Sequence, residues 1–546
     1  MSLRRNWISL LFVLLGMALA STGSCMRATA TAEGAALPGT TLRASTPTLV
    51  VMITVDQLRG DMLDRYRSDM RHGFARLMRG AWFTNAFHDH AITETAPGHA
   101  SLLSGRFPRS TGIMANDAGV ADRSVSLLEA RPNEAGASPH RFMGTTLIDW
   151  IAARNPQSRA LSVSRKDRGA ILPVGKSRQE VYWYSANGNF TTSTYYRDSL
   201  PAWVRDFNAR RIPQRYAGAR WELSRDPATY REPDSVPEEN NGQTVFPYQL
   251  SEDTARVTAT LMATPMHDSI VALFALEGLQ RTNIGRGPHT DVLAVSFSAT
   301  DAVGHAYGPD SREAHENQIR LDETLGWFLD SLYRLRDSST VVVALSSDHG
   351  VQPIPALARR RGDATGDQGL IVSLRDVAAA FRQGMAAAGI DTQTFAYAGE
   401  LVYFDRGKLG NARADSLANA FRSEALRVPG VARVDRLRDV ARADFALDPI
   451  ARRWAHQVSS QSGVDLVITL TRYSYWYSGF GGATHGSPYD DDTHVPVIFY
   501  GPGTRPGRYT EFARVVDIAP TLAALAGGVP PLEKIDGVVL TNAIQR

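Results

Sequence analysis

Short apolar runs rich in β-branched residues recur along the chain and end in polar or acidic positions. They span residues 48–55, 291–298, 340–345, 464–470 and 495–500. Continuous apolar runs of this length are typical of strands that are buried on both faces of a parallel sheet. Helical periodicity lies between them, most clearly over 67–79, 311–336 and 412–426. This alternation predicts an α/β fold, a doubly wound and mostly parallel sheet with helices on both faces.

Acidic residues follow three of the predicted strands. Asp56 comes directly after the first run, and Asp301 and Asp348 come shortly after the next two. In sheets of this kind, ligands bind beyond the carboxyl ends of the strands. We therefore expect a functional site that includes these three carboxylates.

Two regions interrupt the alternation of strands and helices. Residues 180–250 begin with a hairpin pattern, VYWYS–ANGN–FTTSTYY, that turns at Asn187-Gly188. Residues 355–460 form a second long excursion from the pattern. We interpret both as inserted cap segments that cover the sheet edge or the site, within a single catalytic domain that spans residues 48–546.

The first 25 residues have the features of an export signal. Arg4 and Arg5 precede an apolar run over 7–20 that ends in an Ala-x-Ala cleavage pattern. The run is too short to favour a membrane-spanning helix, and no later stretch reaches ~18–20 apolar residues, so we expect no transmembrane helix in the mature protein. Residues 26–47, rich in Ala, Thr, Gly and Pro, are predicted to be a linker. These features predict a periplasmic or secreted bacterial protein.

Cys25 is the only cysteine, which excludes an internal disulfide. It follows Thr22-Gly23-Ser24, a stretch that loosely resembles a bacterial lipobox, although Thr22 matches that pattern poorly. Two interpretations stay open. Cys25 is either a lipid anchor that makes the protein a membrane-anchored lipoprotein, or a cysteine in the linker.

Composition and charge narrow the range of possible functions. The 546 residues are 43% hydrophobic and 21% charged, as is usual for a globular protein. A net charge of +3 gives no support for nucleic acid as a binding partner. Lysine is rare next to arginine and occurs at four positions, Lys166, Lys176, Lys408 and Lys534.

Aspartate and histidine residues near the predicted strand ends have the character of metal ligands. Asp301 and His305 are four residues apart, so one helical turn would bring them together. The other candidates are Asp56, the adjacent pair Asp348 and His349, and His485 in a Gly-rich segment. Mixed Asp/His ligation suits zinc. Two ions ~3.5–4 Å apart would stabilise the attacking and leaving oxygens of a phosphoryl displacement.

Most of the remaining histidines need no chemical role, and an Asp-His pair at a strand end is more often a cap or a hydrogen-bonded turn. We therefore treat five further histidines as structural, with His494 also a candidate for orienting a ligand. These five are His88, His90, His99, His315 and His494.

Thr95 stands before Pro-x-His in AITETAPGHASLLSG, where a helix is predicted to begin. Pro97 suits the first turn of a helix, and Gly98 leaves room for a close backbone approach. The Thr95 hydroxyl is either an ordinary helix cap or a nucleophile at the positive end of a helix. The local sequence fits both interpretations.

Taken together, these segments resemble the alkaline phosphatase superfamily in order and spacing. The segments are Asp56, Thr95-x-Pro-x-His99, Asp301-x-x-x-His305, Asp348-His349, Thr484-His485-Gly486 and the closing stretch VVDIAPTLAALAGGVP at 515–530. The resemblance runs from about residue 48 to the end of the chain, with divergent insertions.

The resemblance implies two zinc sites and a threonine nucleophile. Asp301, His305 and His485 would hold one ion. The other would be held by Asp56, Asp348 and His349, with the hydroxyl oxygen of Thr95 completing its ligands. Metal coordination is a recognised way to activate a hydroxyl, and Thr95 would form a phosphothreonine intermediate.

The branch of the superfamily depends on the nucleophile and on the groups that contact phosphate. Sulfatases use Cys or Ser in a C/S-x-P-x-R pattern, whereas the threonine here is shared by nucleotide pyrophosphatase/phosphodiesterases and by bacterial phosphomonoesterases. The monoesterase type has an asparagine soon after the nucleophile and a later Lys-x-Arg, which correspond to Asn116, Lys166 and Arg168. Three polar donors suit the dianion of a monoester.

The sequence thus predicts an exported two-zinc alkaline phosphatase that hydrolyses small-molecule phosphate monoesters with broad specificity. The main alternative is a phosphodiesterase of the same superfamily, in which Lys166 and Arg168 would face solvent. A transferase that uses lipid or sugar acceptors and a non-catalytic zinc- or phosphate-binding protein are further alternatives.

An aromatic run precedes His485 and comprises Tyr473, Tyr475, Trp476 and Tyr477. These residues either pack inside an insertion or line the leaving-group side of the pocket.

Overall fold

The structure is a computed structural model that describes residues 46–242, 245–477 and 482–545. The predicted export signal over 1–25, Cys25 and nearly all of the predicted linker lie outside the described residues. The part from residue 46 onwards belongs to one compact unit. Among the described residues no single helix is long and apolar enough to cross a membrane. One pair of helical segments, Thr254–Ala263 and Met266–Thr282, is long and apolar enough when both are taken together, and the chain bends by 95° between them.

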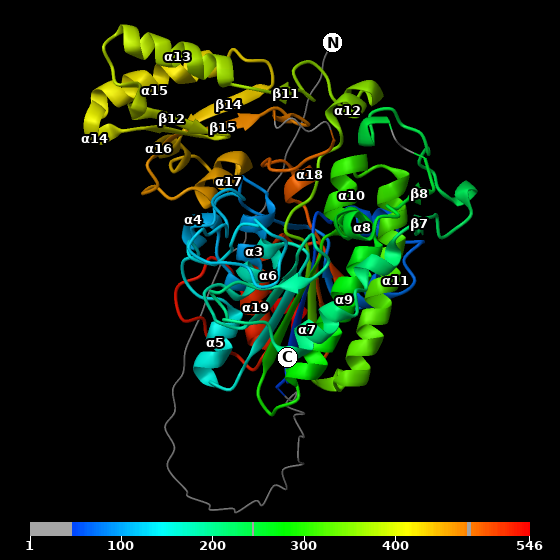
Figure 1. Ribbon diagram of the computed structural model, residues 1–546. Coiled ribbons are helices and arrows are strands. Elements are labelled where there is room, and N and C mark those ends of the chain that lie inside the picture. Colours follow the sequence, from blue (N-terminus) through cyan, green and yellow to red (C-terminus); the bar gives the residue numbers. More distant parts are fainter. Residues whose placement is uncertain (1–45, 243–244, 478–481, 546) are drawn as a thin grey trace, which may run out of the picture. The chain divides into compact units, whose positions relative to one another are not determined.

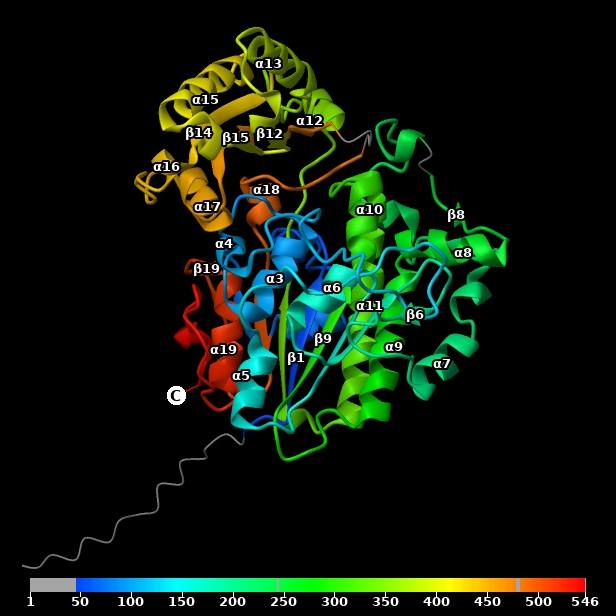
Figure 2. The same cartoon turned by 60° about the vertical axis from the view of Figure 1, so that its left-hand side comes forward.

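A nine-stranded sheet forms the centre of the catalytic domain (Figures 1 and 2), in the order β18-β2-β17-β10-β1-β9-β4-β5-β6. Its middle is parallel: β1 (Leu49–Val55) lies between β10 (Val341–Ser346) and β9 (Asp291–Phe297), and β4 (Ala160–Ser164) and β5 (Glu180–Tyr184) continue beyond β9. The predicted α/β class with a mostly parallel sheet is confirmed.

Alternate residues of β1 enter two different hydrophobic cores, which explains why the whole strand is apolar. Val51 and Ile53 pack on the face covered by α9 (Met266–Thr282) and α11 (Arg312–Leu335). Val50 and Met52 face the opposite core. The helices of that core are α3 (Thr95–Ser104), α5 (Leu147–Arg154) and α19 (Ile518–Leu525). Figure 2 shows these two groups of helices on the two faces of the sheet.

Two predicted elements differ in detail from the observed ones. The run that we expected at 495–500 forms β17 (Val497–Tyr500), which is antiparallel to β10 rather than parallel. The helix expected over 67–79 is broken, and its second half is α2 (Gly73–Leu77). The carboxylate of Asp322 on α11 accepts hydrogen bonds from the backbone N–H groups of Arg71, His72 and Phe74, which fixes the chain in a turn before α2.

The hairpin predicted around Asn187-Gly188 is present at the edge of the central sheet. β5 pairs antiparallel with β6 (Phe190–Thr191), and Trp183 lies opposite Thr191. Gly188 has a φ of 95°, which glycine adopts without the steric cost that other residues meet.

A smaller module, here called the cap module, spans residues 371–476. Its four-stranded antiparallel sheet has the order β12-β13-β15-β14. Helices α13 and α15 cover one face of this sheet, and α16 and α17 cover the other (Figure 2). The strands are β12 (Phe395–Ala398), β13 (Leu401–Phe404), β14 (Val431–Arg436) and β15 (Val464–Leu470).

The cap module corrects the prediction that residues 464–470 belong to the parallel sheet. β15 is as fully buried as β1, because Leu466 and Ile468 enter one core of the cap while Val464 and Val467 enter another. Burial on both faces, rather than parallel pairing, produced the continuous apolar run.

The cap module is anchored on the segment that leads to α3. The guanidinium of Arg452 on α17 lies 2.9 Å from the Asp89 carboxylate, and the side-chain oxygen of Gln457 accepts a hydrogen bond from the backbone N–H of Ile92. The anchor lies only a few residues before Thr95.

The other helices and strands of the described residues complete the fold. They are α1 (Met62–Arg65), β2 (Ala81–Phe83), β3 (Ala86–Phe87), α4 (Pro108–Thr111), α6 (Asp167–Ile171), α7 (Ala202–Ala209), β7 (Arg220–Trp221), β8 (Tyr248–Gln249), α8 (Thr254–Thr260), α10 (Ala299–Tyr307), α12 (Pro355–Arg361), β11 (Ile371–Val372), α13 (Arg375–Ala387), α14 (Arg406–Leu409), α15 (Asn411–Ala425), α16 (Leu437–Val440), α17 (Pro449–Gln457), β16 (Tyr475–Trp476), α18 (Asp490–Thr493), β18 (Gly507–Tyr509) and β19 (Ala513–Arg514).

Candidate active site

The carboxyl ends of three neighbouring strands bring the predicted ligands together. Asp56 directly follows β1, Asp348 and His349 follow β10, and Asp301 lies in the first turn of α10, just after β9. Because β10, β1 and β9 are parallel neighbours, their carboxyl ends meet at one edge of the sheet. We call this group of four residues the catalytic edge.

Three histidines are oriented alike: Nδ1 contacts a backbone carbonyl oxygen, and Nε2 points into the site. The Nδ1 atom of His305 lies 2.7 Å from the carbonyl oxygen of Ala483, and that of His485 lies 2.8 Å from the carbonyl oxygen of Thr93. His349 Nδ1 contacts its neighbour's carbonyl oxygen at 2.9 Å. A carbonyl oxygen only accepts, so each Nδ1 carries the proton and each Nε2 keeps a lone pair. Histidine ligands of metal ions are commonly oriented in this way.

The ligand atoms form two overlapping groups. Asp301, His305 and His485 offer atoms within 4.8 Å of one another, and so do Asp56, Asp301 and His349. Asp301 Oδ1 lies 3.3 Å from His305 Nε2, and Asp56 Oδ1 lies 3.5 Å from His349 Nε2. The first group matches one predicted ligand set, and Asp301 also joins the second.

Asp348 lies beside the second group. Its Oδ2 is 3.6 Å from His349 Nε2 and 3.0 Å from His99 Nδ1. Its Oδ1 accepts a hydrogen bond from the backbone N–H of Gln57 at 3.1 Å. A Cβ on Gly98 would come within 2.0 Å of the Asp348 carbonyl oxygen, so α3 reaches this strand end only with glycine at that position.

The charges at the catalytic edge favour a cation. Burial, reinforced by Asp301 and Asp348, raises the pKa of Asp56 to about 7. The ammonium of Lys166 lies between two carboxylates, 2.7 Å from Asp56 Oδ2 and 2.8 Å from Asp301 Oδ2. Carboxylate oxygens and imidazole Nε2 atoms are the oxygen and nitrogen donors that zinc accepts, so these residues fit a divalent metal ion.

Thr95 is the first residue of α3, and its side chain is buried. Glu94, with extended backbone, holds the N-cap position, so the Thr95 hydroxyl is not the helix cap. Thr95 Oγ1 lies 3.4 Å from His349 Nε2 and 3.2 Å from Lys166 Nζ. Of the two interpretations drawn from the sequence, this geometry favours the nucleophile.

The predicted phosphate contacts line a single cavity. It has a volume of about 410 Å³, and Thr95, Asn116, Lys166, Arg168 and His485 are among its lining residues. The side-chain oxygen of Asn116 accepts a hydrogen bond from the backbone N–H of Ala96 at 2.9 Å, which leaves the Asn116 NH₂ group as a donor. The structure therefore brings all of the predicted phosphate-contacting residues to one cavity with Thr95.

Sequence reasoning missed three residues of this site. Arg165 lines the cavity and lies 3.3 Å from Asp301 Oδ2, although its neighbours Lys166 and Arg168 were singled out. Gln57 donates from Nε2 to Asp301 Oδ1 at 3.2 Å and has a φ of 69°. His99, interpreted as structural, bridges Asp348 and the hydroxyl of Ser296. In the sequence, only the place of His99 in the Thr-x-Pro-x-His pattern could have indicated its contact with Asp348.

The other histidines treated as structural lie outside the ligand groups. His494, considered for orienting a ligand, contacts the carbonyl oxygen of Thr84 at 2.8 Å instead. His315 lies between Glu232 and Asp69, and His88 contacts the carbonyl oxygen of Ser347.

Comparisons with known proteins agree with this geometry. Residues 50–383 match the family described as type I phosphodiesterase / nucleotide pyrophosphatase. The chain is 29% identical to the alkaline phosphatase PhoV of Synechococcus elongatus, over 98% of this chain and 100% of that protein. It is 30% identical to the alkaline phosphatase PafA of Elizabethkingia meningoseptica, over 88% of this chain and 91% of that protein.

A solved structure shows the same architecture. The crystal structure of wild-type alkaline phosphatase PafA is similar with a TM-score of 0.80 at 28% identity, covering 91% of this chain and 99% of that chain. A second crystal structure of that phosphatase carries substitutions of one threonine, one asparagine, one lysine and one arginine, in that order along its chain. The chain described here therefore belongs to the type I phosphodiesterase/nucleotide pyrophosphatase family, in the bacterial alkaline phosphatase branch of the alkaline phosphatase superfamily.

Proposed function

We propose that this protein is an exported alkaline phosphatase that uses two zinc ions and hydrolyses small phosphate monoesters, with broad specificity, through a phosphothreonine intermediate. The observation that carries the proposal is the single cavity that joins Thr95 to Asn116, Lys166 and Arg168 beside the metal-ligand groups. The relatives with similarity over most of the chain are named alkaline phosphatases, which supports the monoesterase reaction.

The metal ions would be held by two ligand sets. Asp301, His305 and His485 would hold one, and Asp56, Asp348 and His349 the other, with Asp301 close to both groups. When bound, zinc would make the Thr95 hydroxyl more acidic and offset negative charge on the oxygens bonded to phosphorus.

The chain's own residues would position the substrate. Lys166 and Arg168 bring positive charge to the phosphate oxygens, and the Asn116 NH₂ group offers a further donor. Thr95 Oγ1, at the N-terminus of α3, is the atom placed to attack phosphorus, and the positive end of the helix favours the phosphate charge there.

The reaction would proceed in two displacements at phosphorus. In the first, the Thr95 hydroxyl loses its proton to solvent, its oxygen bonds to phosphorus, and the ester P–O bond breaks, so that the alcohol leaves with a proton from water. In the second, water attacks the phosphothreonine, the bond to Thr95 breaks, and Thr95 regains a proton as inorganic phosphate departs. Lys166 and Arg168 would hold the phosphoryl group in both steps.

A phosphodiesterase is the second candidate, because the matching family description names that activity. It would need Lys166 and Arg168 turned to solvent, whereas both line the cavity with Thr95. The test compares an aryl phosphate monoester with the corresponding diester. We expect the larger kcat/KM for the monoester, and a large preference for the diester would overturn the proposal.

The metal dependence has its own test. We expect metal analysis of the purified mature protein to find zinc, and a chelator to abolish turnover until zinc is restored. Full activity in the chelated, metal-free protein would overturn this part of the proposal.

Export is proposed from the N-terminal sequence alone. Expression in a bacterium, followed by N-terminal sequencing of the mature protein, tests it. We expect cleavage close to residues 18–25. Incorporation of labelled palmitate that is lost in Cys25→Ser would identify the lipoprotein form.

A further inference from the structure

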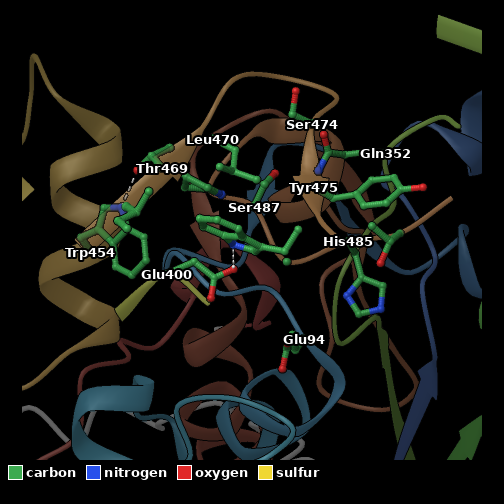
Figure 3. Close-up of a pocket in the computed structure, with 15 residues that line it drawn as sticks. Glu94, Gln352, Glu400, Trp454, Thr469, Leu470, Ser474, Tyr475, His485 and Ser487 are labelled. Atoms are coloured by element: carbon green, nitrogen blue, oxygen red, sulfur yellow. Dashed lines mark hydrogen bonds between the residues drawn. The ribbon is translucent and has the colours of Figure 1, made fainter. Parts of the chain in front are cut away.

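A second pocket lies next to the catalytic cavity, between the cap module and the catalytic edge. His485 lines both cavities, and Glu94, which immediately precedes Thr95, lines the second. Trp454, Tyr475 and Trp476 of the cap module also line it. Figure 3 shows Trp454 and His485 on opposite sides of this pocket. Because the two cavities share His485, the second pocket adjoins the space around Thr95.

The pocket accepts a group of limited size. Its volume is about 180 Å³. Cavities on the order of 150 Å³ accept one benzene-sized ring, so this pocket has room for a single ring or a short chain.

The polar atoms of the aromatic residues that line the pocket are engaged within the protein, so a ligand that reaches these residues meets the carbon atoms of their rings. The indole N–H of Trp454 donates to Thr469 Oγ1 at 2.8 Å, and that of Trp476 donates to Glu400 Oε1 at 2.7 Å. The hydroxyl of Tyr475 donates to the carbonyl oxygen of Gly482. The faces of aromatic rings attract cations.

Acceptor groups are among the polar side chains that line the pocket. Glu94 and Glu400 bring two carboxyl groups. Gln352 is 1% exposed; its Nε2 donates to Asp492, while its Oε1 has no hydrogen-bond partner among the described residues. A buried acceptor without a partner costs free energy that a donor on a ligand would recover. Glu400 forms a hydrogen bond with an indole and, within the described part of the chain, no ion pair.

From these features we propose that the pocket binds the leaving group of the substrate and selects alcohols that carry a protonated amine. The proposal rests on the proposed monoesterase function and names a substrate class for it: phosphate monoesters of short amino alcohols. The ammonium group would lie near the ring of Trp476 and donate to Glu400 and to Gln352 Oε1.

The test uses two matched series of substrates. One consists of ω-aminoalkyl phosphates with chains of two to five carbons, and the other of n-alkyl phosphates in which a methyl group replaces the ammonium. Burial raises the pKa of Glu400 to about 7, so at about pH 8.5 its carboxyl is ionised while an alkyl amine is still protonated. We expect kcat/KM to favour the amine at one or more chain lengths by roughly tenfold to a hundredfold.

Variants separate binding in the pocket from leaving-group reactivity. An ammonium group also makes the alcohol a slightly better leaving group, so the decisive readout is the ratio of amine to alkyl kcat/KM in Glu400→Gln. This variant keeps an acceptor for the Trp476 indole but removes the charge. We expect the ratio to fall by about tenfold. Glu424→Gln, on the exposed face of α15 in the same module, is the matched control and should keep the wild-type ratio.

Each outcome bears on one of the two proposals. Equal kcat/KM for amine and alkyl esters at every chain length would overturn the amino-alcohol proposal, and so would a ratio unchanged by Glu400→Gln. In both cases hydrolysis of the alkyl esters would leave the monoesterase function intact. If neither series nor an aryl phosphate monoester were hydrolysed by the zinc-loaded protein, the proposed function itself would fail, and the substrate class with it.

Discussion

The catalytic edge and the cap module use polar residues in opposite ways. At the edge the carboxylates are buried, and Asp348 is held by a backbone N–H and by His99. The neighbouring His305 and His485 are oriented by backbone carbonyls. The cap residues that line the second pocket include three aromatic side chains, and the Glu400 carboxyl accepts a hydrogen bond from the Trp476 indole. A metal-binding site requires the first arrangement, because its ligand atoms must converge on one point.

The difference has a consequence for specificity. Reaction at phosphorus requires particular side chains, here Asp, His and Thr, at fixed positions. These residues therefore recur in recognisable spacings along the sequence. In the proposal above, the leaving alcohol meets the second pocket, and the cap residues that line it include none of the proposed metal ligands. Changes at the edge should therefore abolish turnover, whereas changes in the cap should alter which ester is preferred.

The largest effect is expected at Thr95. Thr95→Ala removes the attacking oxygen, and loss of a nucleophile lowers kcat on the order of a thousandfold or more. Thr95→Ser keeps the oxygen but adds rotational freedom, so we expect a much smaller loss. Acid quenching of a reaction with labelled substrate should trap phosphate on the wild-type protein and none on the alanine variant.

A control is needed because Thr95 is buried in the first turn of α3. The thermal unfolding of Thr95→Ala should stay close to that of the wild type. If a well-folded alanine variant kept kcat within tenfold of the wild type, the covalent mechanism would be wrong.

A smaller but selective effect is expected at Lys166 and Arg168. Each alanine substitution removes a charged donor to phosphate, and such a bond contributes about 1.5–3 kcal/mol, or roughly ten- to a hundredfold in kcat/KM. The loss should be greater for a monoester than for a diester, because a dianion has more charge to bind. Parallel kinetics on both esters measure the selectivity, and an equal loss on both would contradict the assigned roles.

Lys166→Ala requires one more comparison, because its ammonium also lies between Asp56 and Asp301. Removing it leaves two carboxylates close together with less positive charge. Zinc content of the variant should be measured alongside the rates. Arg168→Ala, whose guanidinium is not paired with either of these carboxylates, separates phosphate binding from metal retention.

The catalytic edge was predictable because one sequence feature, an acidic residue directly after an apolar run, indicates both a strand end and a candidate ligand. An acidic residue after a buried apolar run marks a strand end, and this located Asp56 and Asp348. The position of β15 was not predictable in the same way. Its run is apolar because helices cover both faces of the cap sheet, and that burial pattern is indistinguishable from the pattern of a parallel central strand.

The second pocket left no recognisable pattern in the sequence. Its walls combine residues that are far apart along the chain, and only the position of the cap over the catalytic edge brings Glu94, Gln352 and Glu400 together. The aromatic run before His485 was the one hint. Tyr475 and Trp476 do line the pocket, but their direction depends on β16 pairing with β11, which no local spacing encodes. Gln57 was likewise hidden, since its role depends on a positive φ.

The smallest effect should show whether the two regions unfold separately. Ile53 on β1 and Ile468 on β15 are both fully buried, but they belong to different cores. Replacing either with valine removes one methylene and should cost about 1 kcal/mol locally. Because the cap sheet has its own core, Ile468→Val should accelerate amide exchange in β13 and β15 by about fivefold without changing exchange in β1. Ile53→Val should do the reverse. Hydrogen exchange followed by mass spectrometry measures both, and uniform acceleration across both sheets in either variant would show that the cap and the catalytic domain unfold as one unit.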